Sequence, residues 1–332
     1  ETRDDEKDYE VYSLSGNMKL GSMTLGLNSW IDQNDEMKNT GFYFSLDKTY
    51  TSIGRASKFQ NTTQEFVSTG SEWFWGTKYE LGWIGEEEAG WNIVFNNTDG
   101  TFFTNGQDAN VGNPMLVNTD FTTGELNRMF RQNLSAGGYF EPYLGLRYNS
   151  ISDNSLQDTV RTDLRDVDPN PIDAVVDFQE FRTNNRFKQK ATNSAFGLQA
   201  GARYNQRRGR WRMTCDGTVA TTYNQQRYFA SDIANTTEPD GDVIQSVSET
   251  TFSDQSFVPV LDGSIELAYN ISRDLSLKLG VQGNYMWNGI ARVNTETTEA
   301  NGNSQFGIGT AVQPFDENYV AAGVIFGVEW RR

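Results

Sequence analysis

Residues 197–223 read GLQAGARYNQRRGRWRMTCDGTVATTY, and this stretch decides how the rest of the chain is interpreted. Apolar residues alternate with polar or very small ones on both sides of the polar segment 205–210. The apolar set is Leu198, Ala200, Ala202 and Tyr204 before that segment, and Trp211, Met213, Cys215 and Val219 after it. Because successive side chains of a strand point to opposite faces, the pattern predicts a long antiparallel hairpin with one apolar face. Each arm exceeds the ~5–6 residues of an ordinary strand and reaches the ~9–11 tilted residues that cross a bilayer.

The same alternation recurs along most of the chain. Further strands are predicted at Tyr9–Ser15, Met18–Ile31, Phe42–Tyr50, Glu72–Ile84, Trp91–Phe95, Leu126–Leu134, Tyr139–Ile151, Pro259–Ile271, Leu275–Trp287 and Tyr319–Trp330. Together with the first hairpin, they predict an all-β antiparallel fold of about twelve strands, with ten or fourteen as alternatives. An even number is typical of bacterial single-chain membrane barrels.

The connections between these strands fall into two kinds that alternate along the chain. Short turns are expected at 85–90, 135–138, 205–210 and 270–274, and long connections at 51–71, 99–122, 152–190, 225–258 and 288–317. Short periplasmic turns and long extracellular loops are typical of outer-membrane barrels, whose closure leaves no unpaired edge in lipid. A soluble β-sandwich also alternates, but its strands are shorter and its loops less regular.

Composition agrees with a membrane barrel and excludes other classes. The net charge of −16 argues against a nucleic-acid partner, whose phosphates need a basic surface. No run of eighteen apolar residues is present, so no transmembrane helix is expected. The mean hydropathy of −0.62 fits a barrel, because lipid-facing apolar residues alternate with polar residues of the lumen.

The residue types needed for common catalytic sites are missing. The chain has no histidine, which removes Ser-His-Asp triads and most zinc sites, and its one cysteine, Cys215, cannot form an intrachain disulfide. No spacing singles out a pair of carboxylates for acid–base work. We therefore expect no enzymatic activity, no cofactor and no metal site.

Charged residues on the polar faces of the strands are predicted to line the barrel lumen. They are Lys78, Glu80, Glu141, Arg147, Arg203, Arg212, Asp262, Glu266 and Lys278. They can form a charged pore lining that selects solutes, or an internal network of ion pairs that fills a narrow barrel. The sequence leaves both interpretations open.

Aromatic residues on the apolar faces are predicted to form belts at the membrane interfaces, where amphipathic rings are favoured. They are Trp73, Trp75, Trp83, Trp91, Tyr204, Trp211, Tyr285, Trp287 and Trp330. The expected partners are accordingly outer-membrane lipid and lipopolysaccharide, with other envelope proteins contacted through the long loops. The oligomeric state is not predicted.

The chain is expected to form one domain. Residues 1–8, ETRDDEKD, are charged and predicted to be flexible, and residues 9–332 are assigned to a single barrel domain. No apolar leader segment is present, so we expect the mature form of an exported protein, located in the bacterial outer membrane after removal of its signal peptide.

Three phrases resemble a known family. EPYLGLRY (Glu141–Tyr148), FGLQAGARYNQRRGRW (Phe196–Trp211) and GVIFGVEW (Gly323–Trp330) are similar to an uncharacterised outer-membrane β-barrel family of the planctomycete type. The likeness covers the chain from about residue 70 onward. It implies an outer-membrane location and no catalytic residues. Arg331 and Arg332 follow Trp330, whereas many outer-membrane barrels end on an aromatic residue.

Two functions follow from this reading. The first is a narrow porin-like channel for passive diffusion of small hydrophilic solutes. The alternative is a plugged structural or adhesive barrel that anchors its long loops to a surface layer or a larger outer-membrane complex. The positions of segments 152–190 and 225–258, inside or above the barrel, discriminate between them.

Overall fold

The computed structural model describes residues 41–54, 72–104, 115–134, 138–166, 178–293 and 315–331. These residues form eleven strands, and the strands expected within residues 1–40 lie outside the described part. The strands are β1 Gly41–Gly54, β2 Glu72–Ile84, β3 Ala89–Thr104, β4 Met115–Phe130, β5 Gln132–Leu134, β6 Gly138–Asp166, β7 Phe178–Arg208, β8 Trp211–Thr237, β9 Val243–Asn270, β10 Leu275–Arg292 and β11 Phe315–Arg331. None of the described residues belongs to a helix that could cross a bilayer.

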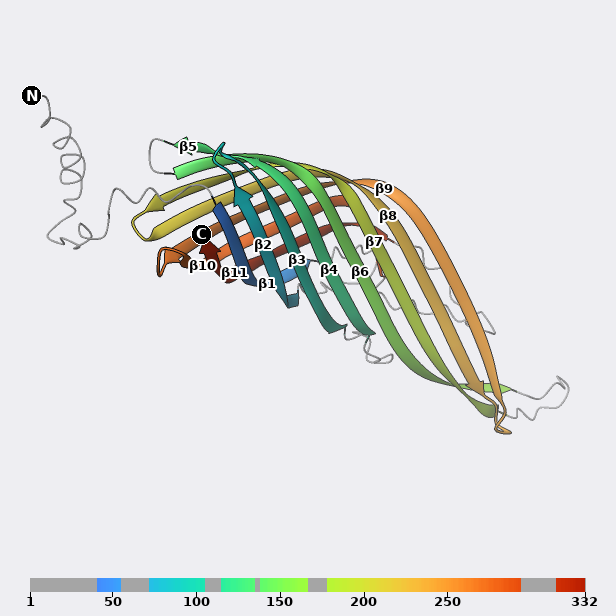
Figure 1. The fold of residues 1–332 in the computed structure, drawn as a ribbon. Helices are drawn as coiled ribbons and strands as arrows, with labels where there is room; N and C mark the ends of the chain where they lie inside the picture. The colour runs from blue at the N-terminus through green and yellow to red at the C-terminus, as the bar shows by residue number, and fades with distance from the viewer. Residues whose placement is uncertain are drawn as a thin grey trace, which may run out of the picture.

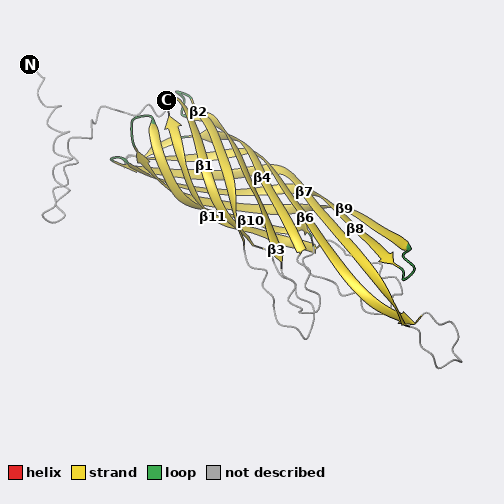
Figure 2. Ribbon diagram, turned by 90° about the horizontal axis from the view of Figure 1, so that it is seen from below, coloured by secondary structure: helices red, strands yellow, loops and turns green. Residues whose placement is uncertain are grey.

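Ten of the strands close into a ring. The strand order is β4-β3-β2-β1-β11-β10-β9-β8-β7-β6-β5, and a further pairing of β4 with β6 closes the sheet. The short β5 continues β4 beyond Arg131 and pairs with β6, so it is not a separate wall strand. The predicted count of twelve is therefore wrong for the described residues, and the alternative of ten holds. Figure 2 shows the front and back walls crossing at an angle, as in a closed barrel.

The two faces of the wall have opposite character. In β1, Ser45, Asp47 and Thr49 are buried, whereas Phe44 and Leu46 are exposed. The same inversion, with polar residues inside and apolar residues outside, is repeated around the ring. A water-soluble protein buries its apolar residues, so this arrangement is that of a barrel in lipid.

One end of the barrel is formed by tight turns. The chain turns between β2 and β3 at residues 85–88, between β9 and β10 at 271–274, and between β7 and β8 at Gly209–Arg210. The last turn is shorter than the predicted 205–210, because Gly209 adopts a φ of 58°, which glycine does without steric cost. Residues 135–137, in the fourth predicted turn, are outside the described part.

At the other end, β6–β9 extend far beyond the remaining strands. They have 29, 31, 27 and 28 residues, against 14 in β1 and 13 in β2. The predicted loops 152–190 and 225–258 are thus wrong over their described residues, which continue the strands in unbroken register out to Asp166↔Phe178 and Thr237↔Val243. This part of the wall projects beyond the other strands, toward the lower right in Figure 1. We call it the extension.

Two buried apolar clusters lie inside the ring. The larger includes Phe121, Val258, Met286, Ile290 and Tyr319 and sits toward the end of the long connections. The smaller consists of Tyr43, Ile84, Met129 and Tyr143 and sits toward the tight turns. Polar side chains occupy the interior between them.

Candidate functional site in the barrel lumen

All nine residues predicted for the lumen have their side chains on the inner face of the wall. Glu80, Glu141, Arg147, Arg212 and Lys278 are buried, and Lys78, Arg203, Asp262 and Glu266 are partly buried. The structure joins them into ion pairs with one another and with further charged residues of the lumen.

Arg203 of β7 reaches across the lumen. Its guanidinium lies 2.8 Å from Glu80 of β2 and 2.9 Å from Asp216 of the neighbouring β8. Strands β7 and β2 are on opposite sides of the ring, so this side chain crosses the interior. A second crossing joins Arg147 of β6 to Asp262 of β9.

Two lysines share the carboxylate of Glu266. Lys278 lies 3.2 Å from Glu266 and 2.9 Å from Asp47, which is fully buried. Lys78 lies 3.7 Å from the other oxygen of Glu266. Each cation therefore has a carboxylate partner, which is what a buried charge requires.

The tight-turn end is closed by a further set of pairs. Arg212 lies 2.7 Å from Glu329, which also contacts Arg331, and Arg131 lies 2.5 Å from Glu141. These pairs are buried or nearly so, and they connect β8 with β11 and the end of β4 with β6. At this end the lumen is filled by paired side chains.

A cavity of about 110 Å³ lies toward the middle of the barrel, among the cross-lumen ion pairs of Arg147 and Arg203, which border it. Its lining includes Thr51, Lys78, Asn92, Thr123, Gln282 and Asn284. A single water needs ~10–15 Å³ of such volume, so the cavity can hold several waters but no larger solute. Phe121 and Ala321 of the apolar cluster border it.

The last residues of β10 close the lumen above the cavity. The register of β10 with β11 shifts between Met286 and Ile290, and Asn288 and Gly289 have positive φ angles of 53° and 78°. This break turns residues 288–293, here called the gate segment, into the barrel. The prediction of a loop over 288–317 is therefore wrong for these residues.

Four side chains of β7, β8 and β9, the strands that follow β10 around the ring, hold the gate segment. Asn224, Gln226 and Ser256 donate to the Gly289 carbonyl at 2.7, 2.6 and 3.0 Å. Asn193 donates to the Ala291 carbonyl at 2.7 Å and accepts from the Ala291 amide at 2.8 Å. The gate segment thus pairs with β11 on one side, from Ile290↔Glu317 to Arg292↔Phe315, and on the other side its backbone bonds to side chains of β7, β8 and β9.

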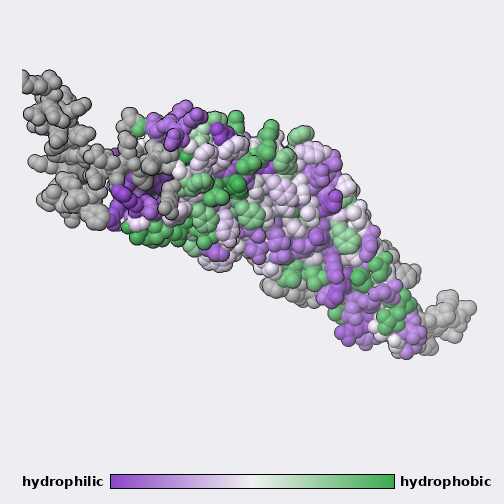
Figure 3. Space-filling view, in the orientation of Figure 1, coloured by the Kyte–Doolittle hydropathy of each residue, from purple (hydrophilic) through white to green (hydrophobic). Residues whose placement is uncertain are grey.

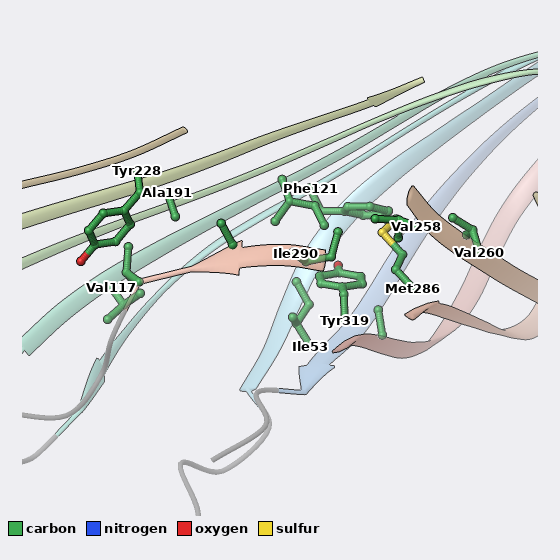
Figure 4. Packing of buried hydrophobic residues seen from close by; sticks show 14 of the residues in the cluster. Ile53, Val117, Phe121, Ala191, Tyr228, Val258, Val260, Met286, Ile290 and Tyr319 are labelled. Atoms are coloured by element: carbon green, nitrogen blue, oxygen red, sulfur yellow. The ribbon is translucent and has the colours of Figure 1, made fainter. Parts of the chain in front are cut away.

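The gate segment also completes an apolar layer. Ile290 is fully buried in the cluster with Phe121, Met286 and Tyr319. Figure 4 shows the end of β10 running between the walls, with these side chains around it. The Arg292 side chain pairs with Asp153 of β6. The described residues therefore close the lumen twice, by apolar packing and by the ion pairs.

Several of these residues were missed by sequence reasoning. Asp47 and Arg131 lie in predicted strands, but neither is among the charged residues predicted to line the lumen. Asn193 and Asn224 lie in polar stretches where nothing distinguishes an inner asparagine from an outer one. The buried Arg292 sits in a segment that reads as a loop.

The predicted belt residues are placed on the outer face. Trp73, Trp75, Trp83, Trp91, Tyr204, Trp211, Trp287 and Trp330 are exposed, and Tyr285 is partly exposed and packs edge-on against Trp287. Trp83, Trp91, Trp211 and Trp330 lie beside the tight turns, and Trp73, Trp75 and Trp287 lie toward the other end. Figure 3 shows hydrophobic side chains over the body of the barrel between them.

Comparison with known proteins agrees with this architecture. The family model described as "Putative beta barrel porin-7 (BBP7)" matches residues 88–331. No curated protein matches the chain. The planctomycete source implied by the resemblance stays a prediction.

Solved outer-membrane barrels align with the chain at low similarity. Outer membrane protease OmpT from Escherichia coli has 10% identity and a TM-score of 0.40, with 88% of this chain and 97% of that chain covered. A major outer membrane protein from Thermus thermophilus has 11% identity and a TM-score of 0.32, with 88% and 99% covered. Neisserial surface protein A has 10% identity and a TM-score of 0.30, with 88% and 98% covered.

Proposed function

The chain belongs to the beta barrel porin-7 family, and from this premise we propose that it is a narrow outer-membrane channel for small hydrophilic solutes whose resting state is closed. The observation that carries the proposal is the gate segment. The ring is closed by the pairs of β10 with β11 and β9 below Met286, whereas residues 290–292 pair with β11 alone and their segment is otherwise held inside the lumen by side-chain hydrogen bonds. Such an arrangement can open at the cost of these side-chain bonds and of the three pairs with β11, while the pairs from Leu275 to Met286 keep the ring closed.

In this proposal the gate segment swings out of the lumen and takes Ile290 with it. The cavity then opens toward the long connections, and solutes enter a passage lined by Thr51, Asn92 and Asn284. At the tight-turn end the solutes pass the ion pairs. The side chains of these pairs must move aside while each charge keeps a partner. Charges of both signs line this passage in similar number, so we expect weak ion selectivity. Passage involves no chemical step.

Release of the gate tests the proposal. Asn193→Ala combined with Asn224→Ala removes hydrogen bonds to both Gly289 and Ala291. Thr192→Ala combined with Gln225→Ala is the matched control, because these neighbours are on the outer face of the same strands. Proteoliposomes are placed in solutions of sugars and amino acids of increasing size, and swelling is recorded.

We expect faster swelling with the release variant than with the wild type or the control, and a size limit that excludes larger sugars. Equal, negligible swelling for all three proteins, with insertion verified, would contradict the channel. Rapid swelling of the wild type for every solute would contradict the closed resting state.

The extension favours a second candidate function, a structural or adhesive barrel. A strand crosses a bilayer with ~9–11 residues, so β6–β9 carry well over ten residues more than the membrane requires. Such a surface suits an anchor for another envelope component. In that case the gate segment is a permanent plug, and the release variant destabilises the barrel without opening it.

A further inference from the structure

A group of basic residues stands on the outer face of the extension. Outward-facing positions of β7 hold Arg186, Lys188 and Lys190, and Arg227 of β8 is a diagonal neighbour of Lys190 through the pairs Lys190↔Phe229 and Thr192↔Arg227. All four are exposed. Diagonal neighbours of this kind lie ~7–8 Å apart, so the charges form one patch. A basic patch is unexpected in a chain with a net charge of −16.

The carboxylates of the described residues leave most of this charge uncompensated. Asp158 accepts two hydrogen bonds from Arg186, at 2.8 and 3.2 Å, and this contact lowers the pKa of Asp158. Asp158 also attracts the neighbouring Lys188, whereas Lys190 and Arg227 have no ion pair with a described residue. On the same face, Lys188 of β7 is paired with Ser231 of β8, and Ser231 is paired with Glu249 of β9. Glu249 is therefore two strands, or ~10 Å, away from Lys188.

A groove with an apolar floor lies next to the two lysines. It has a volume of about 340 Å³ and is lined by Leu116, Leu156, Phe229, Lys188 and Lys190, with Asn118 and Asn154 between them. The lining comes from β4, β6, β7 and β8, which are neighbours in the wall. Positive charges beside an apolar floor are complementary to an amphiphile with an anionic headgroup.

The height of the patch relative to the membrane is fixed by an aromatic row. Tyr148, Phe196, Tyr223 and Phe257 face outward and are paired with one another in register across β6–β9. Tyrosine in such a row marks the membrane interface. Arg227 lies four residues beyond Tyr223, and Lys190 lies six beyond Phe196. At ~3.3 Å per residue and a tilt of ~40°, these positions are about 10 and 15 Å above the row.

We propose that Lys188, Lys190 and Arg227, with the adjacent groove, form a binding site for the phosphate groups of an outer-leaflet glycolipid of the lipopolysaccharide type. The phosphates contact the three cations, and an apolar or sugar portion occupies the groove over Phe229. Such a lipid carries phosphates on sugars that rise above the bilayer surface, at the height of the patch. The site is on the outside of the wall, so it does not depend on whether the lumen conducts.

Binding of a phosphorylated lipid A-type glycolipid to the full chain in detergent tests this site by native mass spectrometry. Lys188→Gln, Lys190→Gln and Arg227→Gln are combined in one variant. The matched control carries Arg207→Gln, Arg208→Gln and Arg273→Gln, which remove the same charge near the tight turns. A basic residue near an anionic lipid surface changes binding by about fivefold, so the patch variant should bind roughly 100-fold more weakly and the control should bind like the wild type.

Three further probes assign the ligand. A dephosphorylated glycolipid should not bind, and inorganic phosphate at millimolar concentration should not displace the glycolipid. Phe229→Ala should weaken glycolipid binding while its circular dichroism stays that of the wild type. Equal binding by the patch variant and the wild type would overturn the site. Binding of the dephosphorylated lipid would overturn the phosphate assignment, and displacement by free phosphate would overturn the lipid assignment.

Discussion

Arg203 illustrates how single residues hold the interior together. Its guanidinium neutralises two carboxylates from different strands, Glu80 and Asp216, and one of these contacts spans the lumen. Charges withdrawn from water are stable only while they remain paired. Each lumen cation therefore acts as a structural cross-link, whatever its role in solute passage.

Arg203→Leu should destabilise the barrel by about 3–5 kcal/mol, because it leaves two carboxylates in the lumen without their partner. Urea unfolding in lipid vesicles measures the change. Arg186→Leu breaks an ion pair whose side chains are 54% and 55% exposed, and it should change the stability little. Equal effects of the two variants would show that the lumen network is not structural.

Leu279 tests the outer face at the same scale. It is 63% exposed and lies four residues from Leu275, beside a tight turn, and eight from Trp287, so it is well inside the apolar band. Leu279→Arg should cost about 2–4 kcal/mol, whereas Leu277→Arg, one step closer to the turn, should cost less. Unfolding measurements on both variants check the gradient, and an unchanged stability for Leu279→Arg would place this face in water.

The sequence predicts which face of the wall a side chain lies on, but not which residue it pairs with across the lumen. Alternation places Glu80 and Lys78 on one face of β2, because the period of a strand fixes direction. It cannot indicate that Glu80 meets Arg203 from the far side of the ring, since that contact depends on closure and tilt. Asp47 was missed for a similar reason. Its ion-pair partner is Lys278, which is 231 positions away along the chain.

At the scale of elements, the end of β10 departs most from a regular barrel strand. Two successive positive φ angles at Asn288 and Gly289 interrupt the ladder with β11, which resumes at Ile290↔Glu317, and direct the gate segment inward. Gly289 is required there, because a Cβ would lie 2.5 Å from the Ser256 hydroxyl oxygen. The extension also differs from the prediction, but here the ladder is longer than expected. It continues through segments whose polar residues on both faces had indicated loops.

Gly289→Ala should loosen the gate segment without unfolding the wall, because the added Cβ clashes with Ser256 and the φ of 78° is unfavourable for alanine. Hydrogen exchange should become faster at Ile290 and Ala291. Gly283→Ala is the control on the same strand, since its Cβ would have 3.9 Å to the nearest atom. Unchanged exchange in the first variant would mean that Ser256 does not restrain the segment.

The whole molecule combines a closed ring with a one-sided extension. The all-β class, the antiparallel arrangement and the inverted faces were predictable, because the period of two is strong wherever one face meets lipid. The strand count was not, since the predicted strands within residues 1–40 are not needed to close the ring of described residues. The extension was missed because a strand with two polar faces carries no such period.

The part of the extension formed by the ends of β6 and β7 should be dispensable for folding. Gln157 and Phe187 are paired in register, so residues 158–186 can be replaced by an Asn-Gly turn that joins β6 to β7. The ring pairs below this point are unaffected, and the shortened protein should fold and insert as the full chain does. The mobility of unheated and heated samples in a gel reports folding, and failure to insert would show that the extension helps to assemble the wall.

The central claim is that the barrel is a channel closed by the gate segment. Single-channel recording in a planar bilayer tests it most directly, with the wild type and the Asn193→Ala, Asn224→Ala variant compared at equal insertion. We predict a wild type that is closed for most of the record with brief openings, and a variant with long openings of the same unit conductance. Silence from both proteins, or a wild type that conducts continuously, would contradict the claim.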